Sequence, residues 1–311
     1  MKKILTIIGS TGIGKTELAI KIAKKINGEI IGLDSRQIYK YMPIGTAQPS
    51  ETELRDVPHH LIGFRDPWHS ISAGEYSKMV FEKVHKIKDR NRFPIICGGA
   101  GLYYRAITKG IFSDSYSDSK IREKLETQYQ ENPFLLFDKL QVADPKYGNI
   151  VHINNKKRLI RALEIIELTG VTPTKHFENQ KKNKNQLLDL YTVLLTLDKN
   201  HHLKRIKART DRMLKIGWIE EVKNLILLER EKQLRLPAAL DSIGYKQIRN
   251  YLHGNVDIHT LKESIVIKTR QYARMQNKWF KKENIDLIVD LTNLNGINFD
   301  SHISDIYKII D

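Results

Sequence analysis

The feature that most constrains the fold is the string GSTGIGKT at residues 9–16, which follows an apolar run at 4–8 and precedes a segment with helical apolar spacing. Glycine lacks a Cβ, so the backbone can curl until successive N–H groups point at one anion. The helix that follows adds the positive end of its dipole. A strand, a glycine-rich loop and a helix opening on Lys-Thr predict a phosphate-binding loop rather than a turn that only caps a helix.

Each polar position of this loop has an expected role. Lys15 brings a full charge to the phosphate oxygens, the Thr16 hydroxyl is expected to hold a hydrated Mg²⁺, and Thr11 is expected to donate a hydrogen bond directly. The pattern does not say which phosphate compound is bound. The complete set of expected anion-binding residues in the loop is Gly9, Ser10, Thr11, Gly12, Ile13, Gly14, Lys15 and Thr16.

Strands and helices alternate in the rest of the N-terminal part, which predicts an α/β fold. A buried strand is expected at 29–33, a helix at 73–90 and a strand at 93–97, and strands joined by helices imply a parallel sheet. Strand character returns at 191–196 and again at 287–289. Long helices are expected at about 200–230 and 259–282, and a C-terminal helix is expected after the last strand.

Between these parts the composition changes, and no strand is expected for about seventy positions. We therefore expect a helical insertion at 113–187 within a core formed by 1–112 and 188–311. An amphipathic helix is expected at 156–168, and the basic run at 181–185 is expected to form a loop.

Charge and cysteine content limit the partners and the compartment. The 311 residues carry a net charge of +16, which favours a polyanion such as nucleic acid, although a generally lysine-rich proteome would have the same effect. Cys97 is the single cysteine, so neither a disulfide framework nor a multi-cysteine zinc site is expected, and the eleven histidines show no ligand spacing. No apolar stretch is long enough to span a bilayer. We expect a cytoplasmic protein that binds no membrane and no zinc.

A second group of polar residues, DSRQIY at 34–39, follows the strand expected at 29–33. In a parallel sheet this edge borders the same crevice as the phosphate loop. Asp34 could accept a proton from an attacking amine or hydroxyl, Gln37 could read a base edge, and Tyr39 could stack or pack. The alternative is that Asp34 or Ser35 only caps a turn.

Several strings in this order resemble the signature of the tRNA dimethylallyltransferases, also called tRNA isopentenyltransferases. The resemblance implies a nucleotide-kinase-like P-loop core with a helical insertion. It also implies transfer of a dimethylallyl group from its diphosphate to the exocyclic amine of the adenosine 3′-adjacent to the tRNA anticodon. The strings are DSRQIY at 34–39, IGTAQP at 44–49, PHHLI at 58–62, GGAGLY at 98–103, RLIRALE at 158–164, GY at 244–245 and TRQYARMQ at 269–276.

The resemblance also implies roles for individual residues. Lys15 and Thr11 would stabilise the departing diphosphate while Asp34 takes the proton of the amine. Arg205 and Arg209, one helical turn apart, could complete the anion clamp or form a solvated basic face. The expected tRNA contacts are Asp34, Ser35, Arg36, Gln37, Ala100, Arg122, Lys157, Arg158, Leu159, Ile160, Arg161, Arg270, Gln271 and Arg274.

The chain departs from the family pattern at Ser10, where proline is usual, at Ala100, where threonine is usual, and at Met275, where a basic residue is usual. A small-molecule or nucleotide kinase would explain the glycine-rich loop but not the charge, and a non-catalytic nucleic-acid-binding ATPase is a third alternative. The expected partners are therefore tRNA, dimethylallyl diphosphate and Mg²⁺, and the chain is expected to act as a monomer.

Overall fold

The computed structural model describes residues 3–110, 118–182, 187–232 and 238–292. The chain divides into two units, which are described separately. The core unit comprises Met1–Thr108 and Leu188–Asp311, and the insertion unit comprises Lys109–Leu187. The expected boundary between 112 and 113 lies outside the described residues.

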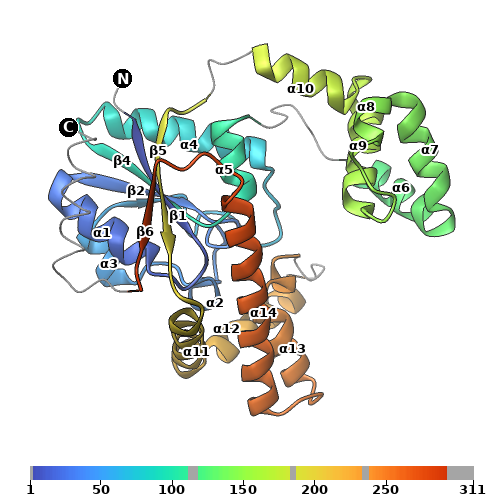
Figure 1. Ribbon diagram of the computed structural model, residues 1–311. Coiled ribbons are helices and arrows are strands. Elements are labelled where there is room, and N and C mark those ends of the chain that lie inside the picture. The colour runs from blue at the N-terminus through green and yellow to red at the C-terminus, as the bar shows by residue number, and fades with distance from the viewer. Residues whose placement is uncertain (1–2, 111–117, 183–186, 233–237, 293–311) are drawn as a thin grey trace. The chain divides into compact units, whose positions relative to one another are not determined.

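The core unit contains a six-stranded sheet in the order β3-β2-β4-β1-β5-β6, with every pair parallel (Figure 1). This confirms the predicted α/β class and the predicted strands. Only the two-residue strand β3 was not predicted, because it is too short to show a periodicity. The strands are β1 (Ile4–Gly9), β2 (Gly28–Leu33), β3 (His59–His60), β4 (Phe93–Gly98), β5 (Leu190–Thr196) and β6 (Leu287–Asp290).

Helices cover both faces of this sheet. Helix α1 (Lys15–Ile26) buries Leu18 and Ile22 against alternate sheet residues such as Leu5 and Ile7. The connection from β1 to β2 moves toward the β3 edge of the sheet, whereas the connection from β3 to β4 moves in the opposite direction, toward the β6 edge. Right-handed connections therefore place α4 (Ala73–Lys88) on the face opposite α1. The short helices α2 (Pro43–Thr46) and α3 (Glu51–Asp56) follow β2, and α5 (Gly101–Thr108) follows β4.

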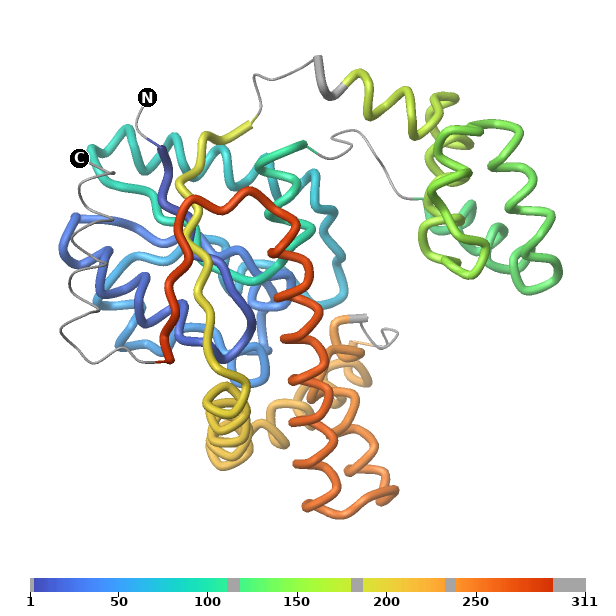
Figure 2. The backbone as a smooth tube through the Cα atoms, viewed as in Figure 1, coloured from blue at the N-terminus to red at the C-terminus, as the bar shows by residue number. Residues whose placement is uncertain are grey.

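The chain re-enters the sheet as β5, beside β1 (Figure 2). The described residues between β5 and β6 form four α-helices and a short 3-10 helix at Ala238–Asp241. The prediction of one helix at 200–230 was wrong, because Gly217 adopts φ +106° and separates two helices. The predicted C-terminal helix lies outside the described residues. The four helices are α11 (Lys199–Lys215), α12 (Trp218–Glu231), α13 (Tyr245–Leu252) and α14 (Ile258–Phe280), and α14 contacts both α11 and α13.

The described part of the insertion unit is helical, as its composition predicts. Leu125, Leu136, Leu140 and Leu159 are almost completely buried and form its own small core. The run expected as a loop at 181–185 begins within a helix, and its remainder lies outside the described residues. The helices are α6 (Ser119–Glu131), α7 (Pro133–Ala143), α8 (Pro145–Gly148), α9 (Lys156–Thr169) and α10 (Pro173–Lys182).

Candidate active site

The 9–16 loop lies at the carboxyl end of β1, where the sequence places it. Gly12 and Gly14 adopt φ +76° and +104°, which L-residues rarely adopt. Helix α1 begins at Lys15 with Gly14 as its N-cap, and no side chain caps it. The first N–H groups of α1 are therefore left for an anion.

Residues from distant elements hold this loop in place. The Thr11 N–H donates to Oε1 of Gln276 at 2.8 Å, and Nε2 of Gln276 donates to the Gly99 carbonyl at 2.8 Å. The Thr11 carbonyl accepts from Nε2 of His202 at 2.8 Å. Burial lowers the pKa of His202, so the ring is neutral and serves as a hydrogen-bond donor rather than a charge. Sequence reasoning did not assign roles to His202 or Gln276.

The Lys15 ammonium is partly buried and donates to the Ser10 carbonyl at 2.8 Å. Burial lowers its pKa from 10.5 to about 8, with Asp34 acting in the opposite direction and Arg209 adding to the decrease. The positive charge of Lys15 is therefore not fully balanced by water or by nearby negative charge. An anion placed beside it would therefore be bound more strongly than at the protein surface.

Both arginines of α11 reach the same region. Nη1 of Arg205 donates to the Ile13 carbonyl at 2.8 Å, which ties α11 to the loop. Arg209 is partly buried, and its burial lowers the pKa of the guanidinium while Asp34 raises it. Arg205 is exposed and Arg209 is partly buried, and both line the cavity described next, so their role as an anion clamp stays a prediction.

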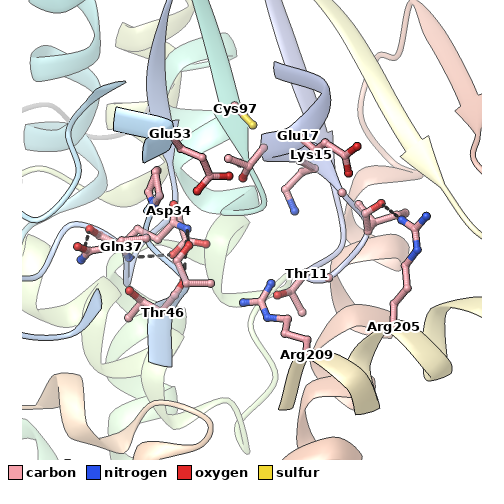
Figure 3. A pocket seen from close by; sticks show the side chains of 18 of the residues that line it. Thr11, Lys15, Glu17, Asp34, Gln37, Thr46, Glu53, Cys97, Arg205 and Arg209 are labelled. Carbon is pink, nitrogen blue, oxygen red and sulfur yellow. Dashed lines mark hydrogen bonds between the residues drawn. The ribbon is translucent and has the colours of Figure 1, made fainter. Parts of the chain in front are cut away.

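These groups surround a cavity of about 480 Å³, the first cavity (Figure 3). Lys15, Thr11 and Arg209 line one wall, and Asp34 and Thr46 line the facing wall. The lining also includes Thr16, Glu17, Gln37, Ala47, Gln48, Pro49, Glu53, Cys97, Gly98, Arg205 and Gln276. Burial raises the pKa of the Cys97 thiol to about 11.

Asp34 lies directly after β2 and does cap a turn. Its Oδ1 accepts hydrogen bonds from the N–H groups of Arg36 and Gln37 at 2.7 and 3.2 Å. Its second oxygen, Oδ2, accepts none from the described residues. The capping role and a role as proton acceptor are therefore compatible, because they use different oxygens.

The Gln37 side chain is fixed by the backbone of the 34–49 segment. Its Nε2 donates to the carbonyls of Ala47 and Thr46 at 2.6 and 3.3 Å, which leaves only Oε1 for a base edge. Gln48 in turn donates from Nε2 to the carbonyls of Gln37 and Tyr39. Tyr39 is 7% exposed, so it packs in the interior rather than stacking on a base.

A second cavity of about 330 Å³ adjoins the first and shares Thr11, Asp34, Thr46 and Arg209 with it. Its other walls come from α11 to α14 and include Trp218, Ser242, Tyr245, Thr269 and Tyr272. Asp34 thus borders two openings. Sequence reasoning did not single out Tyr272, although it lies in the TRQYARMQ string, one helical turn before Gln276.

The expected tRNA contacts differ in their accessibility. Arg36, Arg270, Gln271 and Arg274 are exposed, and Ser35 is partly buried. Ala100 is 7% exposed, so it offers little side-chain surface.

In the insertion unit, Lys157 and Arg158 are exposed on α9. Leu159 and Ile160 are 0% and 4% exposed and pack inside the unit, so their side chains offer RNA no contact. Arg122 and Arg161 form ion pairs with the buried carboxylate of Glu164, at 3.0 and 2.6 Å.

The described residues contain no group of three or more His, Cys, Asp and Glu side chains that could hold a metal ion. Within the same residues, no helix has both the length and the apolar character needed to cross a membrane.

Solved structures define the class of protein to which this arrangement corresponds. A full-length tRNA isopentenylpyrophosphate transferase from Bacillus halodurans matches with a TM-score of 0.71 and 32% identity, covering 100% of this chain and 97% of that one. A eukaryotic dimethylallyltransferase acting on tRNA matches with a TM-score of 0.83 and 27% identity, covering 99% of this chain and 80% of that one.

The family model described as IPP transferase matches residues 37–283, and the chain belongs to this family. A tRNA dimethylallyltransferase from Petrotoga mobilis is 39% identical over 282 residues, which is 91% of each chain. One from Bacillus subtilis is 37% identical, covering 90% of this chain and 88% of that one.

Proposed function

We propose that this chain transfers a dimethylallyl group from dimethylallyl diphosphate to the exocyclic amine of the adenosine 3′-adjacent to the anticodon in tRNA, releasing diphosphate. The observation that carries the proposal is the first cavity, where Asp34 faces Lys15 and Arg209 across a space of about 480 Å³. Such a space accommodates a small phosphorylated substrate between an anion clamp and a proton acceptor.

The clamp acts on the leaving group. As the C–O bond to diphosphate breaks, negative charge gathers on the leaving oxygen and positive charge spreads over the allylic carbons. The Lys15 ammonium, the unpaired N–H groups at the start of α1 and the guanidinium groups of Arg205 and Arg209 stabilise that negative charge. The interactions strengthen as the charge develops, so they lower the barrier rather than only binding the substrate.

Asp34 acts on the nucleophile. The amine attacks the allylic carbon, a C–N bond forms, and Oδ2 of Asp34 takes the proton that the nitrogen must lose. Adenine in a tRNA loop has to leave its stack to reach this oxygen. The second cavity gives it a route that the diphosphate does not use, because it meets the first cavity at Asp34.

Mg²⁺ fits the donors of the first cavity. The Thr16 hydroxyl and the carboxylates of Glu17 and Glu53 line this cavity, and oxygen ligands are those that Mg²⁺ prefers. Thr16 would hold the ion, which would neutralise part of the charge on the diphosphate when bound.

Exposed cations on each of the two units are the proposed tRNA contacts. Arg36, Arg270 and Arg274 belong to the core unit, and Lys157 and Arg158 belong to the insertion unit. Phosphate contacts of this kind position a nucleic acid without reading its sequence. We further propose a cytoplasmic enzyme that acts as a monomer.

Asp34→Asn tests the mechanism. The amide keeps the shape of the carboxylate but cannot take a proton, so single-turnover transfer at saturating substrates should slow by about two to four orders of magnitude. Binding of tRNA and of dimethylallyl diphosphate should persist in direct titrations. The matched control is Asp56→Asn, an exposed carboxylate on α3 paired with Lys24, which should leave transfer unchanged.

Unchanged single-turnover chemistry in Asp34→Asn would leave Asp34 with its capping role alone. Wild-type protein that consumed ATP but not dimethylallyl diphosphate, with unmodified tRNA present, would overturn the proposed function itself in favour of a kinase.

A further inference from the structure

A buried carboxylate on α12 holds the segment that carries Gln37. Glu221 is 7% exposed, and its carboxylate accepts hydrogen bonds from the N–H groups of Ile44 and Gly45 at 2.6 and 2.9 Å. It accepts a third from the hydroxyl of Tyr245 at 2.6 Å. Ile44 and Gly45 lie in the first turn of α2, so Glu221 satisfies N–H groups that the helix itself leaves unpaired.

The surrounding packing fixes α2 at this point. A Cβ on Gly45 would lie 2.0 Å from Nε1 of Trp218 and 2.5 Å from Cζ of Tyr245, so the backbone of α2 lies directly against these two rings. The rings themselves meet edge to face, with centroids 5.8 Å apart. Neither α2 nor the carboxylate can shift without breaking these contacts.

The opposite end of α2 leads to the first cavity. The carbonyls of Thr46 and Ala47 accept the two hydrogen bonds from Nε2 of Gln37, and the Gln37 N–H donates to Oδ1 of Asp34. A continuous series of hydrogen bonds therefore runs from Glu221 through α2 and Gln37 to Asp34. The 9–16 loop has different supports, namely His202, Arg205 and Gln276.

We propose that Glu221 is a positioning residue for the transfer reaction. It fixes α2, and through α2 it sets the orientation of Gln37 and Asp34 toward the acceptor base. It does not contact the diphosphate wall, which is the wall of the first cavity formed by the 9–16 loop and Arg209. The inference rests on the proposed function, because it assumes that Asp34 faces the acceptor. If Glu221 acts in this way, its substitution should slow the transfer step without weakening the binding of dimethylallyl diphosphate.

The test is Glu221→Gln. The amide keeps the volume but presents an NH₂ group to one of the two backbone N–H donors, so one of the hydrogen bonds to α2 is lost. Single-turnover transfer should slow by about 10- to 100-fold, the range expected when a catalytic group is displaced slightly. The Kd for dimethylallyl diphosphate should stay within about twofold of wild type. The matched control is Glu220→Gln, an exposed neighbour on α12 paired with Lys223, which should behave as wild type.

A double-mutant cycle separates positioning from a general loss of structure. If Glu221 acts through Gln37, the double variant Glu221→Gln/Gln37→Ala should transfer no more slowly than the slower of the two single variants. Should Glu221→Gln fold poorly, Tyr245→Phe removes the hydroxyl that donates to Glu221 and lies 3.3 Å from the Met42 carbonyl, and it leaves both hydrogen bonds from α2 to Glu221. That variant should give a smaller loss with the same non-additivity toward Gln37→Ala.

Three results would overturn the inference. These are multiplicative losses in the cycle, a Kd for dimethylallyl diphosphate that rises as far as the rate falls, and an equal loss in Glu220→Gln. Wild-type protein that transfers nothing to tRNA would overturn the proposed function instead. An active wild type with an unaffected Glu221→Gln would overturn only the role of Glu221.

Discussion

The two walls of the first cavity are built in different ways. The 9–16 loop takes its shape from the backbone of adjacent residues, with glycines where φ is positive. The facing 34–49 segment takes its shape from side chains, because Gln37, Gln48 and Glu221 hold its backbone. Both walls are also held by residues from elsewhere in the chain, Gln276 and His202 for the loop and Glu221 for the facing segment. The difference teaches that glycine spacing makes the conformation of the loop recognisable in a short stretch of sequence, whereas the conformation of the facing wall depends on side-chain contacts.

The largest expected effect comes from removing the charge of the 9–16 loop. Lys15→Met should reduce transfer by at least about three orders of magnitude, because the loop amides cannot balance the diphosphate charge alone. The same variant should be more stable at pH 7 by about 1–3 kcal/mol, since a lysine whose pKa is lowered toward 8 carries its charge at a cost to the folded state. Single-turnover transfer and thermal unfolding measure the two effects.

Lys24→Met is the control for Lys15→Met, because Lys24 is exposed on the same helix and pairs with Asp56 at the surface. Its transfer rate should match wild type. A Lys15→Met variant that transfers normally, or one that is destabilised, would contradict this account of the diphosphate wall.

Two glycine substitutions should destabilise the protein for different reasons. Gly45→Ala should destabilise the protein by about 2–4 kcal/mol, because its Cβ would overlap Trp218. Gly12→Ala should cost about 1 kcal/mol through its φ of +76° alone, since its Cβ would have no contact closer than 3.6 Å. Urea unfolding of each variant measures the difference.

Adding Trp218→Phe separates the two causes. The smaller ring makes room for the new methyl group, so it should recover part of the stability of Gly45→Ala and none of that of Gly12→Ala. Equal recovery in both would show that the two walls do not differ as described.

The smallest expected effect concerns pH. The lowered pKa of Lys15 means that the free enzyme holds this proton below pH 8 and loses it above. Affinity for inorganic pyrophosphate should therefore weaken above pH 8, by up to about tenfold per unit. Isothermal titration from pH 7 to 9.5 measures this in wild type and in Lys15→Met, whose difference cancels the titration of pyrophosphate itself. A difference that does not change with pH would exclude Lys15 as the titrating group.

The same contrast explains how much of the molecule the sequence could predict. The glycine-rich loop, the parallel sheet and the position of Asp34 follow from local pattern, because strand and helix periods and glycine spacing are local properties. Glu221 could not be found in that way. It bonds to Ile44 across 177 positions, and Gln276 bonds to Thr11 across 265, and no local pattern encodes such pairs.

The roles of individual charged residues were also harder to predict from the sequence than the roles of motif residues. Arg122 and Arg161 look equivalent to Lys157 and Arg158 in the sequence, yet they satisfy a buried carboxylate, Glu164. Glu164 is on the same helix face as Arg161, one turn away. The sequence alone does not show that this carboxylate is buried, and acidic side chains are seldom fully buried unless paired.

The single thiol of the chain lines the first cavity beside Lys15. With a pKa of about 11, only about one Cys97 in a thousand is a thiolate at pH 8, and the thiolate is the form that oxidants and electrophiles attack. The side chain therefore lines the cavity as a neutral thiol, so the cavity gains a small apolar group there and not a nucleophile.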